Sequence, residues 1–183
     1  MNIIATSLPG VVLIEPRVFG DDRGFFFESF NARAFAQATG VSAEFVQDNH
    51  SHSARGVLRG LHYQIEQPQG KLVRAVTGEV FDAVVDLRRS SPTFGRWEGF
   101  ILSAENKRML WVPPGFGHGY FVLSERTDFL YKTTDYYAPQ HERCVLWSDP
   151  TVGVRWPLVP GQQPVLSAKD QVGLALADAP LYP

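Results

Sequence analysis

The sequence has little cysteine, little net charge and no long apolar run. Its one cysteine, Cys144, cannot form a disulfide within the chain, so we expect a reduced, cytoplasmic setting. No window approaches the roughly 18 uninterrupted apolar residues of a membrane span, and Met1–Leu13 lacks the basic residues of a secretory signal. A formal charge of −2 provides no basic field for nucleic acid. The sequence therefore predicts a cytosolic protein without a membrane or nucleic-acid partner.

The pattern of short runs and turns predicts one all-β domain over residues 1–183. Sixteen glycines and 13 prolines separate short aromatic and β-branched runs, which favours a sandwich or barrel of roughly ten strands. A short helix is expected from the N-cap Asn31 through Thr39, closed by Gly40, and a last helical turn at Ser167–Asp170. Two polar or turn-rich segments are interpreted as loops, Phe19–Gly24 and His50–Arg55.

The stretch Val57–Gln64 places a histidine, an arginine and a glycine inside an apolar run. Alternation along a strand puts His62 on the face opposite Leu61. Arg59 is three residues before His62, so a regular strand would send it to the other face. Gly60 between them predicts a β-bulge that turns Arg59 toward the histidine. A neutral imidazole beside a fixed cation suits proton abstraction next to an anionic substrate, and a buried structural histidine is the alternative interpretation.

One hypothesis for the histidines is a metal site, because double-sheet barrels often hold a metal among histidines. Gly56 to His62, and the Pro-x-Gly turn before His118, partly match the two motifs of the cupin superfamily, whose metal-binding members carry His-x-His. The second histidine of that pair is absent here. His50 and His52 have ligand spacing but lie in a polar segment. Two histidines without a third nitrogen or a well-placed carboxylate make a poor site, so we expect no metal.

The second hypothesis is acid–base catalysis without a metal, and it uses four residues that are far apart in the sequence. His62 is the candidate base, and Asp170 is the carboxylate that would orient its imidazole. Lys71 is the candidate cation beside a developing enolate. The phenol of Tyr131 normally titrates near pH ~10, so it stays protonated and can deliver a proton.

A third set of side chains suits a nucleoside diphosphate. Isolated cations beside turns could grip the two phosphates, and these are Arg23, Arg59, His118 and Lys169. Candidates for reading an amide-bearing base are Glu28, Gln47 and Asn49, and the candidate for stacking on it is Tyr137. The sequence thus predicts local anion binding in a chain without overall positive charge.

Several motifs together resemble the dTDP-4-dehydrorhamnose 3,5-epimerase family, and the resemblance covers Pro9 to Asp170. The matching stretches are Glu15-Pro-Arg-Val-Phe-Gly-Asp-Asp-Arg-Gly-Phe-Phe-Phe-Glu28, Phe45-Val-Gln-Asp-Asn-His50, Val57-Leu-Arg-Gly-Leu-His-Tyr-Gln64, Gln69-Gly-Lys-Leu-Val-Arg74, Ser91-Pro-Thr-Phe-Gly95, Ser103-Ala-Glu-Asn-Lys-Arg108, Phe129-Leu-Tyr-Lys132 and Leu166-Ser-Ala-Lys-Asp170. So many coincident motifs make the resemblance specific.

The resemblance implies a cupin-type jelly roll that acts as a homodimer without metal or organic cofactor. It implies conversion of dTDP-4-dehydro-6-deoxy-D-glucose into dTDP-4-dehydro-L-rhamnose, a step of dTDP-L-rhamnose and lipopolysaccharide biosynthesis. The histidine matching His62, paired with Asp170, would remove the protons from C3 and C5. The lysine matching Lys71 would stabilise the enolate, and the tyrosine matching Tyr131 would reprotonate from the opposite face.

The family's nucleotide contacts would fall on Arg23, Glu28, Gln47, Asn49, Arg59, His118, Glu142 and Lys169. Part of that set would come from the partner subunit, near the N-terminal segment. Two other functions stay open. Epimerases of antibiotic-sugar pathways invert only C3 or only C5 with the same residues, and a cupin could bind a nucleotide sugar without turnover.

Overall fold

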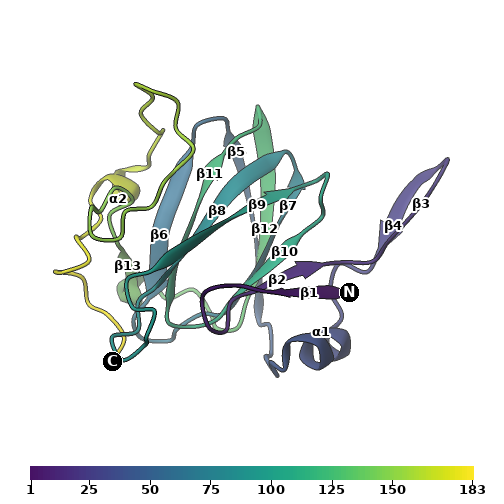
Figure 1. Cartoon of the computed structure of the whole chain (residues 1–183), viewed down its shortest axis with the longest axis horizontal. Helices are drawn as coiled ribbons and strands as arrows, with labels where there is room; N and C mark the ends of the chain where they lie inside the picture. The colour runs from purple at the N-terminus through teal and green to yellow at the C-terminus, as the bar shows by residue number, and fades with distance from the viewer.

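The computed structural model describes residues 1–183, and strands dominate it (Figure 1). One sheet has six strands in the order β1-β2-β10-β7-β12-β5, another has five in the order β13-β6-β11-β8-β9, and β3 and β4 form a separate hairpin. The strands are β1 Asn2–Ala5, β2 Val12–Glu15, β3 Val18–Asp21, β4 Gly24–Phe27, β5 Gln47–Ala54, β6 Leu58–Gln64, β7 Lys71–Thr77, β8 Glu79–Asp86, β9 Trp97–Ser103, β10 Met109–Val112, β11 Phe116–Val122, β12 Arg126–Thr133 and β13 Glu142–Cys144. The predicted all-β class is confirmed.

The two larger sheets pack face to face around an apolar core. Val73 and Ala75 on β7 and Phe129 on β12 meet Val84 on β8 and Tyr120 on β11. Every second residue of each strand points into this layer, as the period of two requires. This core fixes the distance between the two sheets.

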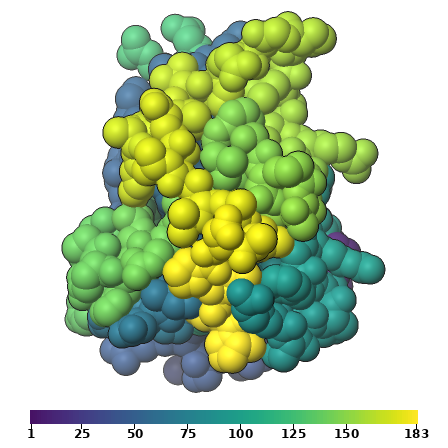
Figure 2. All heavy atoms as spheres, turned by 90° about the vertical axis from the view of Figure 1, so that its left-hand side faces the viewer, coloured from purple at the N-terminus to yellow at the C-terminus, as the bar shows by residue number.

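The outer face of each large sheet is covered by other parts of the chain. Helix α1, Ala32–Thr39, packs Phe35 against Trp111 on the six-stranded sheet. The chain after β13 covers the five-stranded sheet, where Trp156 and Leu176 contact the same apolar cluster as Leu61. Figure 2 shows this yellow C-terminal stretch running down that side of the molecule. No helix of the structure is long and apolar enough to cross a membrane.

Both expected helices are present, and α1 has the predicted ends. Asn31 accepts a hydrogen bond from the Ala34 N–H, and Gly40 adopts a left-handed conformation with φ of 72°. An N-cap of this type stabilises a helix by about 1 kcal/mol. Ser167 caps α2, Ala168–Gln171, in the same way, and a single 3-10 turn, Pro139–His141, precedes β13.

Two segments that the sequence predicts as loops are strands, and this part of the prediction is wrong. Most of the segment His50–Arg55 belongs to β5, which pairs with β12 along its whole length. Its side chains are polar on both faces because one face meets solvent and the other lines a cavity. The segment Phe19–Gly24 lies within the β3–β4 hairpin, where two residues connect the strands. Hydrogen-bonded pairing with a neighbouring strand makes both segments β-strands, and the propensities of their residues do not predict that pairing.

The β3–β4 hairpin projects from the body of the protein as an arm (Figure 1). Its aromatic side chains lie in the open, with Phe25 63% and Phe26 69% exposed. Few contacts hold the arm, one of them the Lys107 ammonium at 4.3 Å from the centre of the Phe25 ring. An isolated two-stranded ribbon is marginally stable, and exposed apolar patches of this kind are typical of interaction surfaces.

The predicted bulge in β6 is confirmed. His62 pairs with His118 on β11 and Arg59 pairs with Tyr120, so three steps on β6 match two on β11. Gly60 has φ of 120°, and its N–H donates to the Asp170 carboxylate at 3.0 Å. The bulge therefore turns Arg59 and His62 toward the same cavity.

Gly60→Ala is expected to destabilise the protein strongly. A Cβ atom at this position would lie 2.6 Å from Gly119 Cα and 2.7 Å from the His118 carbonyl oxygen, and the backbone conformation itself is strained for alanine. Such strain costs about 1–3 kcal/mol before the clash is added. Urea unfolding measures the loss. Gly40→Ala is the matched control, because its φ of 72° is also positive but no atom lies within 4 Å of the new Cβ. Equal losses in both variants would contradict the close packing of β6 on β11.

Candidate active site

A cavity of about 280 Å³ opens between the two large sheets. β5, β7 and β12 form one wall, and β6, β11 and β13 form the other. Its lining residues are mostly polar, and they are Gln47, Asn49, Ser51, Arg59, His62, Gln69, Lys71, His118, Gly119, Tyr120, Phe129, Tyr131, Tyr137, Glu142 and Lys169. The fold therefore gathers most of the candidate residues from the sequence in one place.

 Ten of the thirteen candidate residues from the sequence line this cavity, and the three that do not are Arg23, Glu28 and Asp170.

His62 and Asp170 form a pair, although 108 positions separate them in the sequence. Nε2 of His62 lies 2.7 Å from Oδ1 of Asp170, but the ring N–H does not point directly at that oxygen. Ser167 Oγ at 2.6 Å and the Gly60 N–H at 3.0 Å also donate to the carboxylate. Burial raises the pKa of Asp170, but these partners outweigh it and hold the pKa below its usual range. Burial lowers the pKa of His62, so a neutral ring faces the cavity.

Lys71 stands at the start of β7 and reaches across the cavity toward β6. Its Nζ donates to the His62 carbonyl oxygen at 3.5 Å. Burial lowers the pKa of Lys71 to about 8, while the carboxylates of Glu142 and Asp82 partly offset that effect. The ammonium is therefore poorly solvated, and a developing negative charge in the cavity would be a favourable partner for it.

Tyr131 lies on the wall opposite His62. It comes from β12 of the six-stranded sheet, whereas His62 comes from β6 of the five-stranded sheet. Burial raises the pKa of Tyr131, and the neighbouring Tyr120 raises it further, so the phenol keeps its proton. A ring bound between the two walls would have a neutral base on one face and a protonated acid on the other.

Most of the candidate nucleotide-binding residues lie in the same cavity. Seven of them line it, and these are Gln47, Asn49, Arg59, His118, Tyr137, Glu142 and Lys169. Lys169 and Tyr137 both contact the Glu142 carboxylate, at 2.7 Å and 2.9 Å. This part of the cavity wall therefore carries both a positive and a negative charge.

Arg23 and Glu28 lie outside the cavity of their own chain. Arg23 is on the arm, where it pairs with Asp21 at 2.5 Å. Glu28 follows the arm and accepts a hydrogen bond from Asn31 at 3.2 Å. Within a single chain the fold therefore does not bring these two residues to the other candidates.

Asp82 is a buried member of the site that the sequence analysis missed. It lies on β8 behind His118, and its two carboxylate oxygens are 3.0 and 2.8 Å from His118 Nε2. Burial raises the pKa of Asp82, although His118 opposes that effect. The available signal was a carboxylate between Val80 and Val84 on a core-facing strand, since buried carboxylates are rare without a partner.

The candidate metal ligands point in different directions. His62 and His118 are neighbours across the ladder between β6 and β11, but His62 faces Asp170 and His118 faces Asp82. His50 and His52 lie on the outer face of β5, where both contact Asp128. The two cupin-motif histidines thus each have a carboxylate partner, which is the arrangement of oriented acid–base groups.

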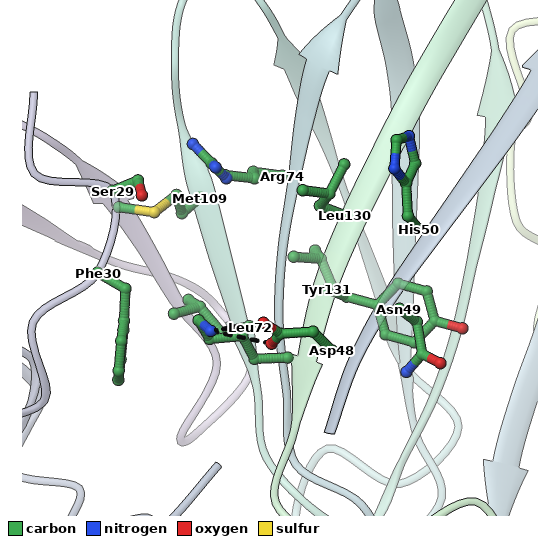
Figure 3. A pocket seen from close by; sticks show the side chains of 12 residues that line it. Ser29, Phe30, Asp48, Asn49, His50, Leu72, Arg74, Met109, Leu130 and Tyr131 are labelled. Carbon is green, nitrogen blue, oxygen red and sulfur yellow. Dashed lines mark hydrogen bonds and ion pairs between the residues drawn. The ribbon is translucent and has the colours of Figure 1, made fainter. Parts of the chain in front are cut away.

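A larger hollow of about 320 Å³ lies on the outer face of the six-stranded sheet (Figure 3). Phe30, Met109 and Arg74 lie around it, whereas the side chains of Tyr131 and Asn49 lie together on the other side of their strands (Figure 3). Neither the histidine–aspartate pair nor the buried lysine reaches this hollow. The candidate acid–base residues therefore line the smaller cavity between the sheets.

The double sheet, with an acid–base cavity between its two walls, defines a cupin-type enzyme. The sequence comparison is more specific: the family model described as dTDP-4-dehydrorhamnose 3,5-epimerase matches residues 5–178. The chain belongs to this family.

Relatives with known names support this assignment. The dTDP-4-dehydrorhamnose 3,5-epimerase of Pseudomonas aeruginosa is 64% identical over 183 residues, which is 100% of both chains. A crystal structure of the Legionella pneumophila epimerase in complex with dTDP-4-keto-L-rhamnose is 51% identical, with a TM-score of 0.95 over 99% of this chain and 97% of that one. A 3'-monoepimerase from Streptomyces bikiniensis in complex with dTDP-quinovose is 36% identical, with a TM-score of 0.88 over 94% of this chain and 86% of that one.

Proposed function

We propose that this chain catalyses the 3,5-epimerisation of dTDP-4-dehydro-6-deoxy-D-glucose to dTDP-4-dehydro-L-rhamnose, in dTDP-L-rhamnose biosynthesis. The observation that carries the proposal is the placement of a neutral histidine and a protonated tyrosine on opposite walls of one cavity. Inversion of a carbon needs proton removal on one face and proton delivery on the other. Residues 1–183 act in this proposal as a single domain.

His62 removes the proton next to the C4 ketone. Its Nε2 faces Asp170, which leaves Nδ1 as the nitrogen that accepts a proton. The negative charge of Asp170 stabilises the imidazolium that forms. The resulting enolate carries its charge on the C4 oxygen, where the ammonium of Lys71 stabilises it.

Tyr131 then delivers a proton from the opposite wall, and the carbon is inverted. The C4 ketone acidifies the hydrogens on both C3 and C5, so the same enolate chemistry serves both centres. Arg59, His118 and Lys169 bind the diphosphate, and Tyr137 stacks on the base, which holds the sugar between the two walls.

Proton NMR of the substrate in D2O tests the proposed function. Double epimerisation predicts that two carbon-bound hydrogens exchange, at C3 and at C5. A single-centre epimerase predicts one exchange, and similarity to the Streptomyces bikiniensis monoepimerase makes this the second candidate. A protein that binds dTDP-sugar without turnover predicts none. One exchange or none would contradict the double epimerisation.

The pH dependence of the rate is expected to be bell-shaped. Epimerisation requires neutral His62, whose pKa burial lowers, so the acidic limb falls below the usual imidazole value of about 6.5. It also requires protonated Lys71, whose pKa is lowered to about 8, so activity declines as the pH rises through about 8. Lys71→Arg keeps a cation that does not titrate in this range, and it is expected to lose the basic limb. The same basic limb in Lys71→Arg would contradict the role of the lysine.

We also propose a homodimer in which the arm of one chain completes the site of the other. Two features support it: the exposed rings of Phe25 and Phe26, and the separation of Arg23 and Glu28 from the cavity of their own chain. A second copy would cover the apolar arm and receive its Arg23 beside the diphosphate. A cytoplasmic setting remains part of this proposal.

Mixing of inactive variants is expected to restore activity if the arm crosses over. Arg23→Ala and His62→Ala are each impaired alone, because one lacks an arm contact and the other lacks the base. In a mixed dimer, one of the two sites keeps its own His62 and receives an intact arm, so activity at low substrate rises above either variant. Tyr131→Phe mixed with His62→Ala is the control, because neither mixed site has both groups. No gain in the first mixture would contradict the shared site.

A further inference from the structure

His62, Cys144 and Asp170 form a cluster of three different metal-binding donor types, partly buried at the side of the cavity. The ligand atoms of His62, Cys144 and Asp170 all lie within 4.8 Å of one another. Cys144 on β13 is the direct ladder partner of His62 on β6, and α2 brings Asp170 to the same point. Cys144 has no place in the epimerisation described above. Its thiol donates a weak hydrogen bond to the Val145 carbonyl oxygen, with Sγ at 3.4 Å.

The ring nitrogen of His62 that faces Asp170 and Cys144 lacks a well-directed hydrogen bond. Nε2 is buried, and Asp170 Oδ1 is only 2.7 Å away. Asp170 is 1% exposed, so its negative charge is held away from water. Burial raises the pKa of the Cys144 thiol to about 12, so in the free protein the thiol is protonated. A buried nitrogen, a carboxylate and a sulfur in one place are the donors of a zinc site.

We propose that His62, Cys144 and Asp170 bind a thiophilic divalent cation, Zn²⁺ as the type case, and that this binding inhibits the enzyme. Bonds of about 2.0–2.3 Å in a tetrahedron place ligand atoms about 3.3–3.8 Å apart, which side-chain movements of about 1 Å would achieve here. These three side chains leave the fourth position of the tetrahedron to water.

The inhibition follows from the proton balance on the imidazole. The thiol releases its proton to solvent and binds as thiolate, and with the carboxylate it neutralises the two charges of Zn²⁺. Nε2 gives its lone pair to the cation, so the one proton of the neutral ring resides on Nδ1. That nitrogen then has no lone pair with which to remove a proton from the sugar. The cation thus disables the base without occupying the place of the nucleotide.

Titration with ZnCl2 tests the site, and the activity readout rests on the proposed epimerase function. Zinc is expected to lower kcat, leave dTDP affinity unchanged and be reversed by EDTA. Cys144→Ala and Cys144→Ser are expected to keep basal activity and to need about tenfold more zinc or higher for half-inhibition. His52→Ala is the control for surface binding, since His52 pairs with Asp128 on the outer face of β5, and it is expected to respond like the unmodified protein.

Co²⁺ supplies a readout that does not depend on turnover. A thiolate-to-cobalt absorption band is expected with the unmodified protein and is expected to be absent in Cys144→Ser. A band that disappears in this variant supports the site even if no epimerisation is found, so failure of the proposed function and failure of the site are distinguishable. No thiolate band with the unmodified protein, or equal zinc inhibition in the Cys144 variants, would overturn the proposal.

Discussion

Replacing His62 with alanine is expected to lower the rate of epimerisation by about 10²–10⁴-fold, the usual contribution of a positioned general base. The side chain is the neutral imidazole of the cavity, and the other wall holds an acid with a raised pKa that does not accept a proton. Hydrogen exchange at C3 and C5 in D2O should be lost together with inversion, because both begin with the same proton removal. NMR of reactions quenched at successive times, at saturating substrate, measures the loss of hydrogen exchange and the loss of inversion.

Binding of dTDP separates a chemical effect from a structural one. The nucleotide-binding candidates are other residues, so calorimetry should show dTDP affinity within a few-fold of the unmodified protein. Asp170→Asn is the companion variant: the carboxylate lies 2.7 Å from Nε2, and its loss removes the charge that stabilises the imidazolium. Full activity in His62→Ala would dismiss the role of this residue as the base.

Tyr131→Phe is expected to abolish inversion by a similar factor of about 10²–10⁴ while hydrogen exchange persists. The variant removes one oxygen from the wall opposite the base and leaves His62 and Lys71 in place. His62 can still remove a proton, exchange it with solvent and return it to the same face. The substrate should therefore take up deuterium without changing configuration, which NMR distinguishes from product formation.

Tyr120→Phe is the matched control, since Tyr120 lines the same cavity and its hydroxyl is already bonded to Ser51 Oγ at 2.8 Å. We expect this variant to keep inversion, because its hydroxyl has no assigned proton to deliver. Inversion at an unchanged rate in Tyr131→Phe would remove the phenol from the mechanism. Loss of exchange together with inversion would instead place Tyr131 in the first proton transfer and contradict the two-wall mechanism.

Local chemistry made several features predictable from the sequence. Helix α1 begins and ends as predicted because Asn31 and Gly40 satisfy specific capping geometries. The bulge was predictable because Arg59 and His62 have the wrong parity for one face, and only a glycine between them allows the correction. In each case the decisive interaction lies within a few residues.

Other features depend on partners that are distant in the sequence. The polar segment Gln47–Ala54 is a strand only because β12 pairs with it. Tyr182, next to the end of the chain, braces β6 by donating to the Gln64 carbonyl oxygen at 2.5 Å. No local sequence pattern predicts such a contact, because the two residues are 118 positions apart.

By itself, the sequence determined the all-β class, the family resemblance and most of the residue types at the site, because these follow from alternation, turns and motifs that are readable one stretch at a time. Only the tertiary structure decided that His62 and Tyr131 stand on opposite walls, that Asp82 lies behind His118, and that Cys144 lies beside His62. Chain segments far apart in sequence become neighbours only when the two sheets bury their apolar faces against each other, and that packing sets which side chains share the cavity.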